Sequence, residues 1–216
     1  AGGVEVSLLG GATGTQPQAA AGPFAGGGLS PSLRLSATAD FNRALQQFET
    51  EVAIMQQNTD GLILDVMRNP GGQVSYVEEL SRRIIPTNFR SLGFEIRATY
   101  NWVAQLQQAV ELSKLFGAED WEIRSLEAIL KDLETAYSEN RGRTGPLSLT
   151  NVSLDTPPAA IVYRKPAIIL TDEFSSSGGD MLPAVLQDNK RVQVVGMRSN
   201  GAGGSVTNNL GGYFSE

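Results

Sequence analysis

The chain has 216 residues, of which 41% are apolar and 19% charged, a composition typical of a soluble globular protein with one domain. Its net charge of −6 argues against a nucleic-acid-binding surface, which would need clustered Lys and Arg. The chain contains no Cys and no His, which excludes disulfides, thiolate metal sites and a histidine base within it, and we expect no metal or other cofactor.

The first 39 residues are rich in Gly and Ala and predict a linker or tail, in which VEVSLL (4–9) is one possible strand. Ordered structure is expected to begin near Asp40, which is a good N-cap for a helix. After it, apolar residues recur on one helical face: Phe41, Leu45, Phe48, Val52 and Met55. We therefore expect the folded core to span residues 40–216.

The apolar run GLILDVM (61–67) predicts a strand of the kind that is buried on both faces in a parallel sheet. The turn RNPGG follows it, and QVSYVEELSRRII (73–85) returns to helical spacing. The order helix, strand, turn, helix favours an α/β fold built from βαβ-type units.

The segment 89–99 predicts a further strand, and 142–158 predicts a long loop. Between them, 101–116 and 119–139 predict two helices separated by Gly117. We interpret this pair as a helical insertion over 101–143, either a surface-packed hairpin or a substrate gate or oligomer contact.

The second half of the pattern starts with a buried strand, AIILT (167–171). The polar run DEFSSSGGD (172–180) comes next, then a helix over about 179–189, a strand over 191–197 and a glycine-rich loop over 199–206. Three serines and two glycines between a strand and a helix fit two interpretations. They cap the helix, or they form the turn that carries a nucleophile.

Two glycine turns thus follow predicted parallel strands, at 69–72 and at 175–179. The carboxyl ends of parallel strands share one edge of the sheet, where ligands bind. An acyl-transfer site needs a serine oxygen and two N–H donors around one position, about 3 Å from each. The two turns have these groups, although each turn alone is equally compatible with a plain polar turn.

Taken together, GLILDVMRNPGG (61–72) and KPAIILTDEFSSSGGDMLPAVLQDNKRVQVVGMRSNGAGGSV (165–206) resemble the two signature regions of the C-terminal processing, or tail-specific, serine peptidases. The resemblance implies a crotonase- and ClpP-like ββα core with a helical hairpin insertion. It also implies a serine endopeptidase that acts on protein or peptide substrates. Nucleic acid is not expected as a partner, a homo-oligomer is possible, and the family suggests an extracytoplasmic location.

By position in the second signature, the resemblance makes Ser177, three residues before Asp180, the nucleophile, with Ser176 as the second choice. It makes the backbone N–H groups of Gly178 and of Gly71 or Gly72 the oxyanion donors.

Asp188 matches a family aspartate that often supports the site, and it is equally well interpreted as a polar residue at a helix end. Many members of the family carry a lysine base in the glycine-rich loop, where this chain has Ala202. Lys190 is the nearest lysine in sequence and is expected to be solvent-exposed. Another branch of the family has a GAGG loop, as this chain does, and its catalytic residues resemble a Ser–His–Glu arrangement. We therefore expect the base outside this chain, as part of a longer protein.

Two other functions remain compatible with these residues. The missing lysine and histidine would suit a family member that binds peptides without cleaving them. A crotonase-type enzyme acting on acyl thioesters also uses paired backbone N–H donors, but it needs no serine nucleophile.

Overall fold

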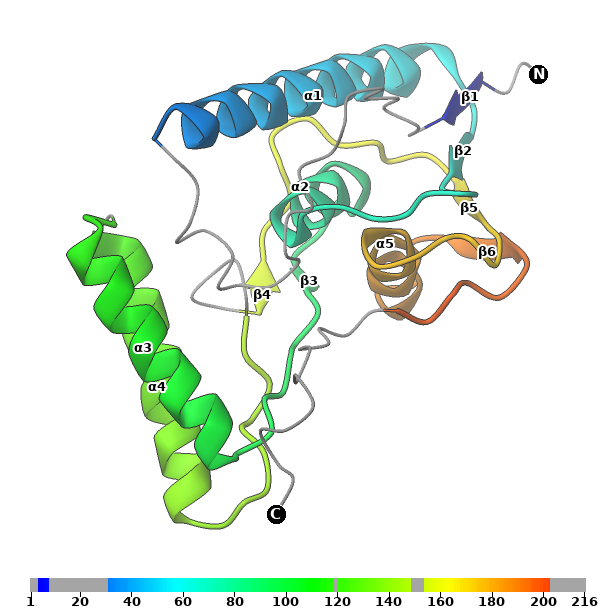
Figure 1. Ribbon diagram of the computed structural model, residues 1–216. Coiled ribbons are helices and arrows are strands. Elements are labelled where there is room, and N and C mark those ends of the chain that lie inside the picture. The colour runs from blue at the N-terminus through cyan, green and yellow to red at the C-terminus, as the bar shows by residue number, and fades with distance from the viewer. Residues whose placement is uncertain (1–3, 8–30, 119, 149–153, 203–216) are drawn as a thin grey trace.

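The computed structural model describes residues 4–7, 31–118, 120–148 and 154–202 (Figure 1). Its main sheet has four parallel strands in the order β1–β2–β5–β6. Their bounds are β1 (Val4–Ser7), β2 (Leu62–Asp65), β5 (Ala167–Thr171) and β6 (Gln193–Gly196). The α/β class expected from the sequence is confirmed.

Three helices pack on one face of this sheet: α1 (Pro31–Asn58), α2 (Val74–Ile84) and α5 (Gly178–Asp188) (Figure 1). Apolar residues alternate along β2, so Leu62 and Leu64 enter the core while Ile63 lies half-buried on the other face. The core contains residues of the sheet and of all three helices: Phe48, Val52, Met55, Leu62, Leu64, Val77, Leu80, Ile84, Ile169, Met181, Leu182, Val185 and Leu186.

The expectation that the strand over 61–67 is buried on both faces is therefore wrong for the described part of the chain. Ile63 pairs in register with Ile168 on β5, and both side chains are half-buried. The helices that follow β2 and β5 both cross on the side of Leu64 and Ile169, so that face forms the core.

The amino-terminal part of the chain differs from its sequence prediction. Residues Val4–Ser7 form β1, so the possible strand is confirmed and lies in the sheet beside β2. Helix α1 begins at Pro31 rather than at Asp40, which lies inside the helix and pairs with Arg43. Proline suits the first turn of a helix because the N–H that it lacks has no partner there. Residues 1–3 and 8–30 of the predicted linker lie outside the described residues.

The predicted helical insertion is an antiparallel pair, α3 (Tyr100–Leu115) and α4 (Asp120–Ser138), which projects away from the sheet (Figure 1). The two segments that connect it to the rest of the chain run side by side. They pair as β3 (Phe89–Arg90) with β4 (Asp155–Thr156), and again at Phe94 with Leu147 and at Arg97 with Arg143. The segment 142–158 was predicted to be a loop, but it supplies the partner of the segment 89–99.

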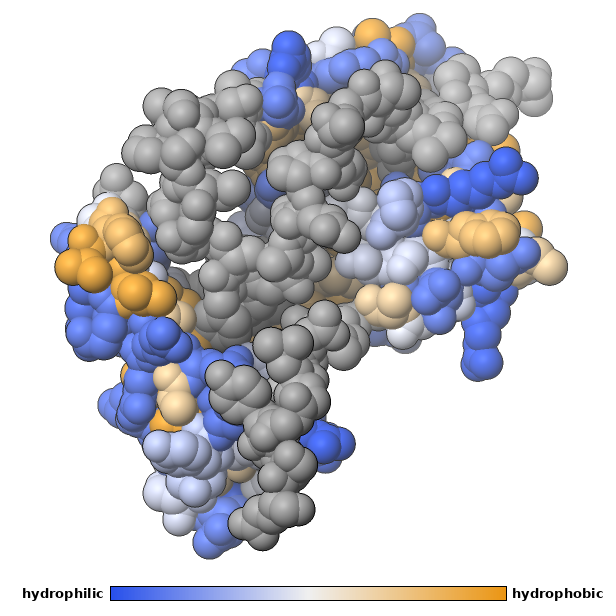
Figure 2. All heavy atoms as spheres, viewed as in Figure 1, coloured by the Kyte–Doolittle hydropathy of each residue, from blue (hydrophilic) through white to orange (hydrophobic). Residues whose placement is uncertain are grey.

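The helical pair has a small core of its own, in which Val103 and Leu106 of α3 meet Leu133 of α4. At its far end, Leu115 and Phe116 are 76% and 64% exposed, and Figure 2 shows the apolar surface there. No helix among the described residues is long and apolar enough to cross a membrane.

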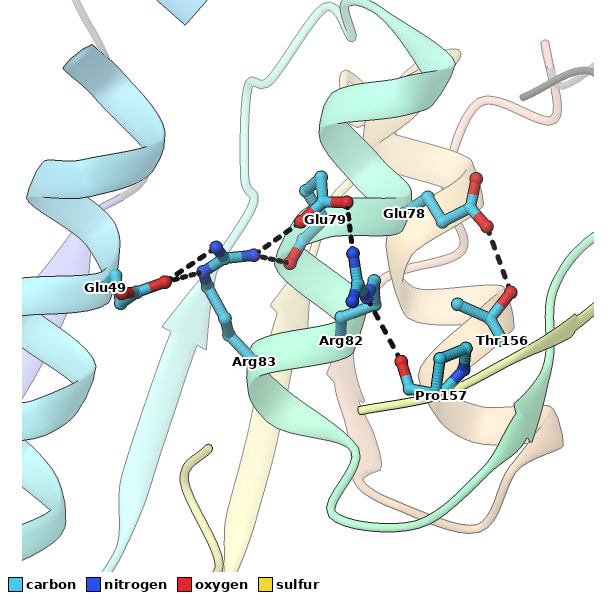
Figure 3. Close-up of polar contacts among 7 residues, drawn as sticks. All are labelled: Glu49, Glu78, Glu79, Arg82, Arg83, Thr156 and Pro157. Carbon is cyan, nitrogen blue, oxygen red and sulfur yellow. Dashed lines mark hydrogen bonds and ion pairs between the residues drawn. The ribbon is translucent and has the colours of Figure 1, made fainter. Parts of the chain in front are cut away.

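An ion pair and hydrogen bonds join α2 to neighbouring segments (Figure 3). Arg83 is only 8% exposed, and its guanidinium donates to Glu49 on α1, at 2.6 and 2.9 Å, and to Glu79 on α2, at 2.7 Å. On the same helix, buried Glu78 accepts a hydrogen bond from the Thr156 hydroxyl of β4. The buried charge of Arg83 is tolerated because its carboxylate partners offset the cost of removing it from water.

Candidate active site

The candidate site lies at the carboxyl ends of the parallel strands, which together form one edge of the sheet. Because β2, β5 and β6 are parallel, the loops 66–73, 172–177 and 197–202 all leave the same edge. The sequence prediction that the glycine turn and the serine turn meet is tested directly by the contacts between these loops.

The first two loops are packed against each other with no room for a further atom. A Cβ added at Gly71 would lie 2.5 Å from the Ser177 Cβ and 2.6 Å from the Gly178 nitrogen. Gly71 also has a φ of +98°, which side-chain-bearing residues rarely adopt. Alongside this contact, the Ser176 N–H donates to the Asn69 carbonyl at 2.8 Å.

Asp172 and Ser175 join the loops on the side nearest the sheet. One oxygen of Asp172, Oδ1, accepts hydrogen bonds from the N–H groups of Arg68, Phe174 and Ser175 at 2.9–3.1 Å. The Ser175 hydroxyl, which is fully buried, lies 2.8 Å from the Val66 carbonyl and 3.0 Å from the same Asp172 oxygen. Ser175 is therefore a structural residue whose oxygen is already engaged.

These contacts set the charge state of Asp172. Desolvation alone would raise the pKa of this carboxyl group, but the hydrogen bonds from Arg68, Ser175 and Phe174 outweigh it and hold the pKa below its ordinary value. Asp172 is thus an anion that accepts hydrogen bonds from both loops. Asp172 was not among the site residues predicted from the sequence, although an Asp side chain in a turn commonly accepts a hydrogen bond from the backbone two residues on, as it does here from Phe174.

Ser177 differs from Ser175 in backbone conformation, hydrogen bonding and burial. It is the residue before α5, its φ is +52°, and its hydroxyl makes no capping hydrogen bond to the helix. Its side chain is half-buried. A non-glycine residue at positive φ carries backbone strain, and such strain is concentrated at functional sites. Ser176, the second choice, is also half-buried, and its N–H and carbonyl are both used within the turn.

The backbone donors lie beside Ser177. A Cβ added at Gly178 would be 3.1 Å from the Gly72 nitrogen, so these two peptide groups are neighbours. Within the described part of the chain, neither the Gly178 N–H nor the Gly72 N–H has a hydrogen-bond acceptor. The Gly71 N–H, in contrast, donates to the Asn69 side chain at 2.8 Å. Of the two donors that the sequence left open, Gly72 is the one with a free N–H.

The third loop is fixed to the serine turn. The Asn200 N–H donates to the Ser175 carbonyl at 2.9 Å, and the N–H groups of Gly201 and Ala202 donate to the two carboxylate oxygens of Asp180 at 2.8 and 3.0 Å. The remainder of the predicted glycine-rich loop, from 203 onward, lies outside the described residues.

The other two predicted residues are not brought to this edge. Asp188 is exposed in the last turn of α5, about 15 Å along the helix axis from Gly178. Lys190 follows the same end of the helix and is exposed, as expected. Among the described residues there is no group of acidic side chains that could hold a metal ion.

The fold and the three joined loops define an α/β protein whose candidate site is a serine turn at the carboxyl edge of a parallel sheet. The model of peptidase family S41 matches residues 30–211. The chain therefore belongs to this family, that of the C-terminal processing peptidases, as the two signature regions predicted.

Several chlamydial proteins and solved structures are similar to this chain. A protein of Chlamydia trachomatis serovar D is 28% identical over 187 residues, covering 76% of this chain and 30% of that protein. A protein of Chlamydia pneumoniae is 28% identical over 170 residues, covering 70% of this chain and 28% of that protein. This chain thus spans less than a third of the length of either relative.

Mature CPAF has a similar fold, with a TM-score of 0.58 and 24% sequence identity over 74% of this chain and 34% of the CPAF chain. The complex of mature CPAF with lactacystin gives the same TM-score at 23% identity, with the same coverage of both chains. These likenesses show the fold, and the more specific crotonase- and ClpP-like description of the core stays a prediction.

Proposed function

We propose that this chain is the nucleophile-bearing part of a serine endopeptidase of the C-terminal processing type. In this proposal Ser177 attacks the peptide carbonyl, and the N–H groups of Gly178 and Gly72 receive the resulting oxyanion. The family membership supports the reaction class. The observation that carries the residue assignment is the contact of the Gly71–Gly72 turn with the Ser177–Gly178 peptide.

The arrangement suits acyl transfer because its donors are held in place before the substrate arrives. Gly178 is the first residue of α5, so its N–H lies at the positive end of the helix dipole. The Gly72 N–H is fixed beside it by the close packing of the two loops. Donors that need no reorganisation stabilise the developing negative charge most effectively.

The proposed reaction has two steps. The Ser177 oxygen bonds to the carbonyl carbon while its proton passes to a base, which then gives the proton to the leaving amine. A water molecule next attacks the acyl-enzyme, its proton passes through the same base to the Ser177 oxygen, and the acid product leaves. A neutral serine hydroxyl reacts slowly without such a base.

The base is proposed to come from outside this chain. The sequence has no His, and the position of the family lysine is Ala202. Lys190 is exposed beyond the far end of α5. Both oxygens of Asp180 already accept N–H hydrogen bonds. Because the relatives are more than three times as long as the matched region, other segments have ample length to supply the base.

The missing base also favours a second candidate, a family member that binds peptides without cleaving them. In both cases we propose that the partner is a protein or peptide, and the family suggests an extracytoplasmic location for the encounter.

A fluorophosphonate probe distinguishes the two candidates when it is applied to the natural full-length protein. We expect a covalent adduct on Ser177, located by mass spectrometry of the labelled peptide, and its loss in Ser177→Ala. Ser176→Ala is the matched control and should still react. A folded protein that stays unlabelled would refute the peptidase and leave the binding protein. Label on Ser176 instead would move the nucleophile by one residue.

A further inference from the structure

The carboxylate of Asp180 lies between the serine turn and the glycine-rich loop. Its Oδ1 accepts a hydrogen bond from the Gly201 N–H at 2.8 Å, and its Oδ2 accepts one from the Ala202 N–H at 3.0 Å. An ionised carboxylate has only acceptor oxygens, so it satisfies both N–H groups at once. Such charge-assisted hydrogen bonds are about twice as strong as neutral ones.

The backbone of Asp180 is fixed at the same time by the residue proposed as nucleophile. The Asp180 N–H donates to the Ser177 carbonyl at 3.0 Å as the first turn of α5 forms. Asp180 therefore contacts both segments: its backbone N–H binds Ser177, and its side chain binds the 200–202 loop. The Asn200 side chain adds a second, longer link between the loop and the serine turn, since its Nδ2 donates to the Glu173 carbonyl at 3.4 Å.

The loop is held through its backbone as well. Gly201 has a φ of +81°, and the preceding Asn200 is attached to the Ser175 carbonyl. Ala202 has no functional side chain, so its contribution to the contact is its backbone N–H. Together these bonds place residues 200–202 beside the turn that presents Ser177.

We propose that Asp180 is a positioning residue that holds the 200–202 loop against the amino-terminal end of α5 and so keeps the turn of Ser177 in its reactive conformation. The inference rests on the proposed function, because the reaction that it supports is that of Ser177. Asp180 is not the base in this account, since both its oxygens are occupied by the N–H groups of the loop.

Two measurements on the full-length protein test this role. Asp180→Ala removes both acceptors, whereas Asp180→Asn keeps one acceptor oxygen and presents an amide donor to the second N–H. Amide hydrogen exchange at Gly201 and Ala202 reports the loop, and the rate of fluorophosphonate labelling reports Ser177. Asp132→Asn, an exposed charge change on α4, is the matched control and should alter neither.

We expect exchange at Gly201 and Ala202 to accelerate about tenfold or more in Asp180→Ala, with labelling slowed by a similar factor and Asp180→Asn between the two. The thermal unfolding midpoint separates this effect from loss of the fold, and the intermediate Asp180→Asn variant keeps the comparison possible if Asp180→Ala unfolds. The pH midpoint of labelling should be unchanged in Asp180→Asn, because the base is elsewhere.

Unchanged exchange at Gly201 and Ala202 in the variants would overturn the inference whatever the activity. Faster exchange with unchanged labelling would overturn the positioning role, and loss of the pH midpoint in Asp180→Asn would make Asp180 the base. Failure of the unsubstituted protein to react is a different outcome. It is seen before any variant is compared, and it refutes the proposed function together with the inference that rests on it.

Discussion

Two serines of the same short run have different environments. Ser175 is fully buried, and its hydroxyl contacts the Val66 carbonyl and the Asp172 carboxylate. Ser177, two residues later, is half-buried in a left-handed backbone conformation with no capping hydrogen bond. Ser175 therefore stabilises the loops, whereas Ser177 is the proposed nucleophile. We expect a substitution of Ser175 to lower stability and a substitution of Ser177 to remove the proposed reactivity.

Gly71 lies at the close contact between the glycine turn and the serine turn. We expect Gly71→Ala to lower the free energy of unfolding by about 2 kcal/mol and to slow labelling of Ser177 at least tenfold, because the new Cβ overlaps Ser177 and Gly178. Denaturant unfolding and probe kinetics measure the two effects. Gly72→Ala serves as the control for stability only, since a Cβ there meets no atom within 4 Å. Equal stability of the two variants would contradict the close contact.

Asp172 predicts a specific pH dependence of stability. Its folded-state pKa is lowered below the ordinary value of 3.8, so its hydrogen bonds stabilise the fold above the unfolded-state pKa. This contribution is lost as the pH falls through the lowered folded-state pKa. We expect the stability difference between wild type and Asp172→Asn to be largest near neutral pH and to shrink below about pH 4.

Denaturant unfolding across that pH range checks this expectation. Glu173→Gln is the matched change at the exposed neighbour and should leave the stability close to that of wild type throughout. A difference for Asp172→Asn that is the same at every pH would mean that the ionised carboxylate is not what joins the loops.

At the scale of elements, the described residues form two apolar cores, one between the sheet and its helices and one within the helical pair. Helices α1, α2 and α5 complete the core around β2 and β5, and the loops of the candidate site emerge from that unit. The pair α3–α4 buries its own apolar residues and is carried by the paired segments around β3 and β4. The candidate site therefore depends on the sheet and its three helices. The α3–α4 pair has a separate core and contributes no described residue to that site.

Leu133 tests this separation because it is fully buried between α3 and α4. We expect Leu133→Ala to destabilise the pair by about 2–5 kcal/mol, so that its amides exchange faster while those of β2 and β5 keep their rates. Hydrogen exchange measured segment by segment gives both results. Leu64→Ala, in the main core, should instead accelerate exchange in β2 and β5. Equal effects of the two variants in all segments would show one cooperative unit.

At the scale of the whole molecule, the described residues contain the proposed nucleophile and its donors at one edge of a parallel sheet. The chain spans less than a third of the length of its chlamydial relatives, so the proton acceptor and the substrate-binding surface are expected to involve further segments. We therefore propose that the activity requires segments beyond those that the structure describes.

Much of the fold could be predicted from the sequence because its signals are local. The apolar runs at 61–67 and 167–171 locate β2 and β5, and helical spacing locates α2 and the α3–α4 pair. The start of α1 was missed by nine residues, because a good N-cap at Asp40 does not prevent a helix from beginning earlier at Pro31.

The sequence by itself determined the family and the strand–turn–helix order, and the resemblance to that family predicted Ser177, three residues before Asp180, as the nucleophile. Only the tertiary structure decided how the three loops are joined. The short strand β4, the contact of Gly71 with Ser177 and the bonds of Asp172 and Asp180 link residues from 21 to more than 100 positions apart. Such pairings depend on chain geometry and mutual burial, which no local pattern of residues records.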